Sequence, residues 1–217
     1  MGTTRKNYGL ALEKILEKID TDSSLPKLLL HVCCAPCSSY VLNYLSKYFH
    51  IILLFYNPNI EPEEEYQKRK AELLRLREEL QLAESVKIMD CAYNPREFRA
   101  IAQGMENEQE GGERCRRCYR LRMEEAAKTA KKINCDYFTT TLTISPMKNA
   151  QIINEIGEGL AEIYGVKHLP SDFKKKEGYK KSIQLSKEYN LYRQDFCGCE
   201  FSKKQRETQK ENQTNSE

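Results

Sequence analysis

The 217-residue chain has no tryptophan and no long apolar run. Its thirteen tyrosines therefore supply most of the aromatic surface. The longest apolar runs, such as Ile51–Tyr56, have the length of a strand and fall far short of the ~20 residues that a membrane-spanning helix needs. Met1–Lys18 is amphipathic and lacks the apolar core of a secretory signal peptide. We therefore expect a cytoplasmic protein with no part in a membrane.

The chain also lacks an internal repeat and a Gly/Ser-rich linker, and its hydrophobic content of 40% is enough for a core. These features favour a single domain over residues 1–202. The last fifteen residues, Lys203–Glu217, are polar and show no periodicity, so we expect a disordered tail there.

Strand and helix patterns alternate along the chain. Short apolar or β-branched runs predict strands at Lys27–Val32, Ile51–Tyr56, Val86–Met89, Tyr137–Leu142 and Lys167–Leu169. Apolar residues at helical spacing predict helices at Tyr8–Ile19, after Ala35, and at Glu63–Leu82, Arg114–Ile133, Lys148–Tyr164 and Tyr179–Tyr189. The helix at Lys148–Tyr164 is expected to face inward through Ile152, Ile156, Leu160 and Ile163. This alternation predicts an α/β fold, a parallel sheet with helices on both faces.

The active site of such a sheet lies at the carboxyl ends of its strands. Cys33, the turn at Asn57–Asn59 and the segment Thr143–Ser145 each follow a predicted strand directly. All three are therefore expected at the same edge of the sheet.

Seven of the nine cysteines fall into three tight groups: Cys33, Cys34 and Cys37; Cys115 and Cys118; and Cys197 and Cys199. Stable disulfides are rare in the reducing cytosol, so this usage indicates metal binding or thiol–disulfide chemistry. Cys91 and Cys135 stand alone and are expected to be small core residues. His31 and His168 are expected to be core histidines with satisfied hydrogen bonds.

Each group has its own local chemistry. The first turn of a helix that begins near Arg114 would carry Cys115 and Cys118 on one face. The helix dipole favours thiolates there, and so do Arg114, Arg116 and Arg117. Cys33 and Cys34 are adjacent, so the chain must turn at Ala35-Pro36 for both to reach one metal. Cys37 is a third ligand, a ligand of a second metal, or a core residue.

Cys197-Gly198-Cys199 differs from the other groups because its glycine allows the unusual backbone that brings two thiols together. Such a pair can cycle between dithiol and disulfide or can chelate a metal, and the sequence does not decide between these roles. Two of the cysteine pairs could also form a structural zinc site, but a third pair would then be left over.

The basic residues gather near these cysteines. Glu113–Lys132 holds eight Lys/Arg against three Glu, and Ser171–Arg193 holds seven Lys/Arg against three Asp/Glu. The net charge is only +3, because Glu61–Glu84 has eight Glu against five Lys/Arg. This distribution indicates a polyanion near the reactive site, or else solvated helix faces.

Six motifs in order resemble the QueH-type epoxyqueuosine reductases, a family of the adenine nucleotide α-hydrolase-like superfamily. They are Leu30-His31-Val32-Cys33-Cys34-Ala35-Pro36-Cys37, Tyr56-Asn57-Pro58-Asn59-Ile60, Cys115-Arg116-Arg117-Cys118-Tyr119-Arg120-Leu121-Arg122, Thr139-Thr140-Thr141-Leu142-Thr143-Ile144-Ser145-Pro146, Lys148-Asn149 and Tyr192-Arg193-Gln194-Asp195-Phe196-Cys197-Gly198-Cys199. The resemblance runs from about Leu28 to Ser202.

The resemblance implies a Rossmann-like fold and reduction of epoxyqueuosine to queuosine at the wobble position of tRNA, the last step of queuosine synthesis. It implies that Cys33, Cys34, Cys115 and Cys118 bind a 4Fe–4S cluster. Cys197 and Cys199 would be a redox-active pair, or ligands of an additional mononuclear iron to which Cys37 contributes. The partners it implies are the anticodon stem-loop of tRNA and an unidentified electron donor.

ATP-using proteins of this superfamily carry a glycine-rich phosphate loop after the first strand. The same position here is Cys33–Ser39, which has no glycine to bring amides around a phosphate. A cluster in place of a nucleotide is therefore expected. Two other functions stay open: a cluster-dependent tRNA thiolase that uses ATP, and a zinc-stabilised tRNA-binding module without catalysis.

The reaction also needs proton donors, positioning groups and contacts to RNA. The candidate proton donors are Tyr66, Tyr119, Asp172 and Lys148. The candidate positioning groups are Tyr66, Arg69, Asn57 and Asn59. The candidate phosphate contacts are Arg120, Arg122, Lys174, Lys175, Lys180 and Lys181.

Overall fold

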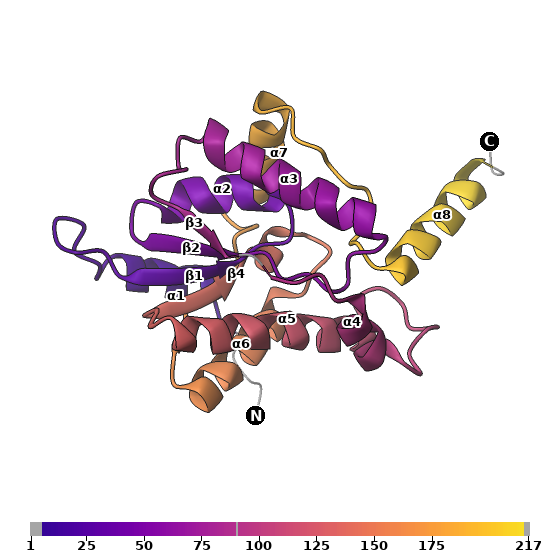
Figure 1. Ribbon diagram of the computed structural model, residues 1–217, viewed down its shortest axis with the longest axis horizontal. Helices are drawn as coiled ribbons and strands as arrows, with labels where there is room; N and C mark the ends of the chain where they lie inside the picture. Colours follow the sequence, from indigo (N-terminus) through magenta and orange to yellow (C-terminus); the bar gives the residue numbers. More distant parts are fainter. Residues whose placement is uncertain (1–5, 90, 215–217) are drawn as a thin grey trace.

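The chain folds around one parallel five-stranded sheet (Figure 1). The computed structural model describes residues 6–89 and 91–214. The strands are β1 (Lys27–His31), β2 (His50–Leu54), β3 (Lys87–Met89), β4 (Tyr137–Thr140) and β5 (Lys167–His168). They lie in the spatial order β3-β2-β1-β4-β5, and every neighbouring pair is parallel. The predicted α/β class and parallel sheet are confirmed.

Helices cover both faces of the sheet. The helices are α1 (Tyr8–Leu16), α2 (Ala35–Leu45), α3 (Glu63–Glu79), α4 (Pro95–Ala102), α5 (Glu113–Lys132), the short 3₁₀ helix η1 (Thr141–Ile144), α6 (Ala150–Tyr164), α7 (Gly178–Glu188) and α8 (Glu200–Thr214). In Figure 1, α2, α3 and α7 lie above the sheet, and α5 and α6 lie below it. The layers therefore form the three-layer arrangement that the alternating pattern predicts.

The central strand β1 shows why the sheet is covered on both sides. Leu28 and Leu30 pack with the α2 side of the core, whereas Leu29 packs with the α5 side. Side chains alternate along a strand, so a strand buried on both faces reads as a continuous apolar run. All three leucines are fully buried.

The strand order places a topological switch at β1. The chain moves from β1 outward to β2 and β3, then returns to β4 on the other side of β1. A crevice opens at the carboxyl ends of the two strands where such a reversal occurs. Cys33 lies two residues beyond β1, and Thr141 follows β4 directly. The predicted shared edge is therefore present.

The polar segment after Ser202 differs from its prediction. Where we expected a disordered tail, α8 begins at Glu200 and continues to Thr214, and it projects from the rest of the molecule in Figure 1. Its first turn is held by the Ser202 hydroxyl, which donates to the Cys199 carbonyl at 2.9 Å. A helix stabilised by such local contacts and by ion pairs such as Lys204–Glu200 needs no apolar stripe, so periodicity does not reveal it. Residues 215–217 lie outside the described part.

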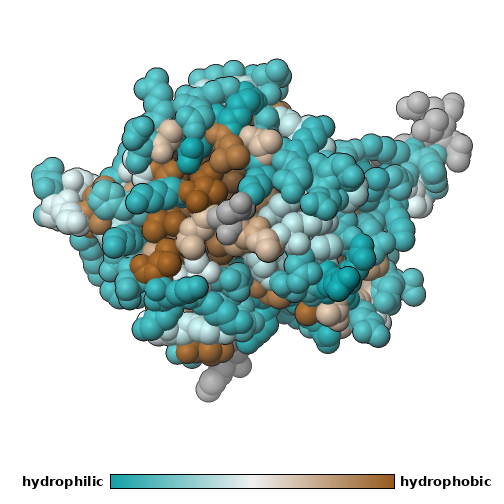
Figure 2. Space-filling view, viewed as in Figure 1, coloured by the Kyte–Doolittle hydropathy of each residue, from teal (hydrophilic) through white to brown (hydrophobic). Residues whose placement is uncertain are grey.

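Figure 2 shows a mostly hydrophilic face, with hydrophobic side chains gathered where α2 and α3 meet the strands. Within the described ranges, none of the helices has both the length and the apolar character required to cross a bilayer.

Candidate metal and redox site

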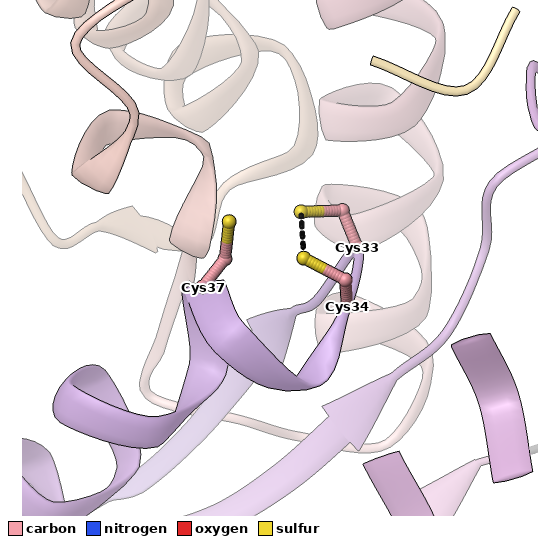
Figure 3. A group of neighbouring side chains, drawn as sticks. All are labelled: Cys33, Cys34 and Cys37. Carbon is pink, nitrogen blue, oxygen red and sulfur yellow. Dashed lines mark hydrogen bonds between the residues drawn. The ribbon is translucent and has the colours of Figure 1, made fainter. Parts of the chain in front are cut away.

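The first cysteine group lies at the junction of β1 and α2. Cys34 has extended backbone angles (φ −171°, ψ 161°), and α2 begins at the next residue with Pro36 in its first turn. The Sγ atoms of Cys33 and Cys34 are 3.8 Å apart, and those of Cys33, Cys34 and Cys37 all lie within 4.8 Å of one another. Figure 3 shows the three side chains directed toward one another. They form the only such trio of ligand side chains in the part of the chain that the structure describes, and they could hold a metal ion.

The three thiols of this group differ in pKa. Hydrogen bonds from the Cys34 and Cys37 thiols hold the pKa of Cys33 well below its usual range. The same bond to Cys33 raises the pKa of Cys34 to about 12, and the pKa of Cys37 is raised for the same reason. Metals bind thiolates, so Cys33 is the thiol of this group that is best prepared to bind one.

The second and third cysteine groups meet at a small cavity. Cys115 and Cys118 lie in the first two turns of α5, and Cys197 and Cys199 lie just before α8. Both pairs line this cavity, together with Asn59, Phe98, Glu110, Arg114, Tyr119, Arg122 and Ser202. The structure thus brings these four thiols around one space. Of the four predicted cluster ligands, Cys33 and Cys34 belong to the first group, and Cys115 and Cys118 line this cavity.

Burial outweighs the helix dipole at the start of α5. It raises the pKa of Cys115, and it raises that of Cys118 to about 12. Of the three neighbouring arginines, Arg114 favours the Cys115 thiolate, but burial outweighs its charge. Arg114 lines the cavity and donates to the Met105 carbonyl at 2.7 Å, whereas Arg116 and Arg117 pair with Glu113. For Cys118, the compensating charge comes from farther along the helix.

Arg122 supplies that charge from inside the protein. Its side chain is only 2% exposed, its Nε donates to the Cys118 carbonyl at 3.3 Å, and its Nη2 is buried with no hydrogen-bond partner among the described residues. Burial opposes its charge, but the nearby Cys118, Cys197 and Cys33 thiols raise its pKa overall. Arg122, predicted to contact an RNA phosphate, is instead buried, with its guanidinium among the cysteines.

A larger cavity opens beside the thiols and is here called the thiol cavity. It has a volume of about 490 Å³, and Cys33, Cys37 and Cys197 line it together with Arg122 and Lys148. Its other sides include Ile144–Met147, Arg193–Phe196 and four residues of α8: Ser202, Gln205, Arg206 and Gln209. Lys148 is half-buried, and the nearby Cys197, Tyr119 and Cys33 offset its burial and raise its pKa. Three thiols and four cationic side chains, those of Arg122, Lys148, Arg193 and Arg206, thus surround one open space.

The Cys197-Gly198-Cys199 loop is held by α3. Arg69, 1% exposed, donates from Nε to Glu65 at 2.6 Å and from Nη1 to the Cys197 carbonyl at 3.0 Å. Gly198 has φ +133°, and a Cβ there would meet Ile60 at 3.0 Å. The predicted need for glycine between the two thiols is confirmed. All nine cysteines are free thiols.

Comparison with known proteins agrees with this geometry. Residues 28–205 match the family model described as QueH, epoxyqueuosine reductase QueH. The chain belongs to the QueH family. It is 43% identical to the epoxyqueuosine reductase QueH of Staphylococcus epidermidis over 210 residues, which cover 93% of this chain and 87% of that protein. It is 40% identical to the QueH of Streptococcus pyogenes serotype M1 (91% and 78% covered) and 36% identical to that of Thermotoga maritima (81% and 89% covered).

The QueH match includes all three cysteine groups, and it also includes contacts to sulfur that sequence reasoning missed. Gln194 donates from Nε2 to the Cys34 Sγ at 3.0 Å, the Gly111 amide donates to the Cys115 Sγ at 3.2 Å, and the Thr141 Oγ1 lies 3.8 Å from the Cys33 Sγ. Gln194 and Thr141 lie inside the motifs that carry the resemblance. No pattern in the sequence assigns them this role.

Other residues of this QueH family member have structural roles. Tyr66 is buried, packs on Phe55 and donates to its carbonyl at 3.3 Å, so it is a core residue. His31 hydrogen-bonds to Thr140 at 2.8 Å and to the Tyr56 carbonyl at 3.0 Å, as predicted for a core histidine.

Three further predictions about core residues have mixed outcomes. His168 is half-buried, and its Nδ1 is buried with no hydrogen-bond partner among the described residues, so the expected core position and hydrogen bonding are incomplete. Cys135 is buried in the core, as predicted, whereas Cys91 is half-buried against it.

Proposed function

We propose that this chain reduces epoxyqueuosine to queuosine at the wobble position of tRNA. The observation that carries the proposal is the QueH match over residues 28–205, which covers every residue of the three cysteine groups. The positions of these groups beside a crevice at the topological switch of the sheet support it. The reaction removes the epoxide oxygen as water and leaves an alkene, so it consumes two electrons and two protons.

The sulfur-only donor set fits an iron–sulfur cluster, because cysteine thiolates are the usual ligands of such clusters. We propose that Cys33, Cys34, Cys115 and Cys118 hold a 4Fe–4S cluster. Cys197 and Cys199 then act as a redox pair or, with Cys37, bind an additional mononuclear iron. The compact trio of Cys33, Cys34 and Cys37 supports a part for Cys37 in the metal site. When bound, an iron–sulfur centre supplies electrons to the substrate.

The thiol cavity is the proposed substrate site. The side chain of the modified base enters it beside Cys197, and the cations Arg122 and Lys148 lie along its wall. The Lys148 ammonium, whose pKa is raised, stays charged and donates hydrogen bonds to the departing oxygen. Arg122 is buried and fixed through Cys118, so it stabilises negative charge at this wall without reorganisation.

The other candidate proton donors fit this role less well. Tyr66 donates to the Phe55 carbonyl in the core, and Asp172 pairs with Lys174 at 2.5 Å outside the thiol cavity. Tyr119 lines the small cavity between the two cysteine pairs, and burial raises its pKa. Lys148 is the candidate that lines the thiol cavity itself.

The two other functions considered for the sequence are less well supported. A thiolase that uses ATP needs a phosphate loop after β1, and the trio of cysteines takes up that position. A zinc-stabilised module without catalysis leaves the open thiol cavity without a role. The relatives compared above all carry the name epoxyqueuosine reductase, which favours the reductase. A cytoplasmic location stays a prediction from the amphipathic N-terminal segment and the short apolar runs of the sequence.

A genetic experiment tests this function in the cell. A strain that lacks its epoxyqueuosine reductase accumulates epoxyqueuosine in tRNA, and expression of this chain should convert it to queuosine. Cys33→Ser should fail to do so, whereas Cys135→Ser, a change of a buried cysteine outside the site, should succeed. Persistence of epoxyqueuosine with the folded wild-type protein present would reject the proposed activity.

A further inference from the structure

A second, wider groove lies next to the thiol cavity. It has a volume of about 890 Å³ and is lined by the start of α1, by Tyr40 and Tyr44 of α2, by Pro146–Gln151 and by Asp172–Lys176. We call it the tyrosine groove. Pro146, Met147 and Lys148 line both the groove and the thiol cavity, so the two spaces share a wall. A chain that leaves the thiol cavity over this wall enters the groove.

The groove offers flat aromatic surfaces. Tyr40 and Tyr44 are one helical turn apart, and their rings are stacked with centroids 5.8 Å apart and planes 6° from parallel. Both side chains are half-buried, so their packing fixes the rings while part of each remains exposed. Burial raises the pKa of both phenols, and that of Tyr44 reaches about 12. The rings therefore stay neutral and suit stacking against a base.

The groove also carries positive charge. Five lysines line it against two acidic residues: Lys6, Lys148, Lys174, Lys175 and Lys176 against Glu13 and Asp172. Lys174 pairs with Asp172, and Lys176 pairs with Glu13. Lys175 is exposed and has no ion pair within the described ranges, so its charge is available to a ligand. The net charge of the lining favours an anion.

The shared wall ends in an exposed apolar side chain. Met147 is 72% exposed, the largest exposed fraction among the large hydrophobic residues of the described chain. Met147 lines both the tyrosine groove and the thiol cavity. A methionine in such a position can pack against the face of a base, as apolar wedges do when a nucleotide leaves its stack.

We propose that the tyrosine groove binds the single-stranded RNA that flanks the modified nucleotide. This inference rests on the proposed function, in which the wobble nucleotide occupies the thiol cavity. Unpaired RNA is bound by stacking its bases on aromatic rings and by placing its phosphates near cations, and the groove offers both. Tyr44 stacks with a neighbouring base, Lys175 contacts a phosphate, and Met147 packs where the strand crosses the shared wall.

The test measures binding of an unmodified RNA hairpin that carries the anticodon loop, by fluorescence anisotropy with the metal-loaded protein. Lys175→Glu should weaken binding severalfold and should reduce the slope of log affinity against log salt by about one or more, since each phosphate contact contributes about one. Tyr44→Leu keeps apolar packing but removes the ring, and it should weaken binding at least about fivefold. Met147→Gln should also weaken it.

Two variants serve as controls. Lys87→Glu makes the same charge change at an exposed position on β3, and Tyr48→Leu changes the tyrosine in the turn after α2, which does not line the groove. Both should bind RNA as the wild type does. Equal losses for Lys175→Glu and Lys87→Glu, or unchanged binding by Lys175→Glu, would overturn the proposal. Because the hairpin carries no epoxide, this result is independent of the reduction assay.

Discussion

At the scale of single residues, the site is organised by a buried cation. Arg122 lies within the protein, contacts Cys118 through its carbonyl and lines both the small cavity and the thiol cavity. Sequence reasoning placed it on a basic surface, because it lies among other arginines in a charged helix. Arg122 differs from Arg120 in burial: the Arg122 side chain lies on the inner face of α5, whereas Arg120 is exposed.

Arg122→Gln is expected to lower the midpoint reduction potential of the metal-loaded site. Glutamine can still donate to the Cys118 carbonyl but removes the positive charge that stabilises the more negative, reduced state. Arg120→Gln removes the same charge from the exposed neighbour and is the matched control. Equal potentials in a redox titration of the wild type and both variants would show that the Arg122 charge does not act on the site.

Because the His31 side chain is buried, we expect the free energy of unfolding to depend on pH. Burial lowers the pKa of His31 from 6.5 to about 4, so the unfolded chain binds this proton more readily than the folded chain does. Stability is therefore fully present above pH 6.5 and is lost as the pH falls toward 4, by as much as about 3 kcal/mol for a shift of this size.

Urea unfolding between pH 7 and pH 4.5 measures this loss. His168, whose pKa is lowered to about 3 by burial, adds to it with the same sign. The control is His50→Gln, because His50 is exposed. A free energy of unfolding in the wild type that stays constant over this pH range would contradict the assignment of both histidines as neutral in the folded chain.

At the scale of elements, periodicity predicted most helices but misplaced one buried face. On α5, apolar spacing predicts an inward face of Met123, Ala126, Ala127, Ala130 and Ile133; the first four are fully buried, and Ile133 is half-buried. On α6, the predicted face was Ile152, Ile156, Leu160 and Ile163, but Ile163 is 61% exposed, and the buried residues include Ile153, Asn154, Gly157 and Leu160. Apolar spacing could not reveal this rotation, because its causes are not apolar.

Two contacts rotate α6. The Asn154 side chain donates to the Ser171 carbonyl at 2.7 Å and accepts from the Ser171 amide at 2.8 Å, so this polar residue is satisfied in the core. Gly157 lies against His168, where a Cβ would come within 2.4 Å of the ring. The helix α8 was missed for a related reason, because polar contacts and not an apolar stripe hold it.

Gly198→Ala tests the loop that presents Cys197 and Cys199. Alanine at φ +133° is strained, and its Cβ would crowd Ile60 and the Arg69 guanidinium, so the loop must shift. We expect a loss of roughly 1–3 kcal/mol in stability and faster alkylation of the two thiols in the metal-free protein. Gly159→Ala, at a helical position with open space, is the control. Alkylation at the wild-type rate would mean that the glycine is not needed to hold the pair.

At the scale of the whole molecule, the sheet order explains why cysteines so far apart in sequence converge. The switch between β2 and β4 around β1 opens the crevice, α5 supplies one pair of thiols below the sheet, and the segment before α8 supplies another. The sequence predicted the parallel sheet and the shared edge, because strand ends and turn residues are local signals. It did not predict how the groups divide into a trio and a cavity of four, since that depends on loop packing.

The measurement that tests the central claim most directly is mass analysis of tRNA nucleosides after anaerobic incubation of purified, iron-loaded protein with epoxyqueuosine-containing tRNA and a reductant. The account predicts conversion of epoxyqueuosine to queuosine, the loss of one oxygen atom per nucleoside, and no conversion by Cys33→Ser. Unchanged epoxyqueuosine with the iron-loaded wild-type protein would contradict it.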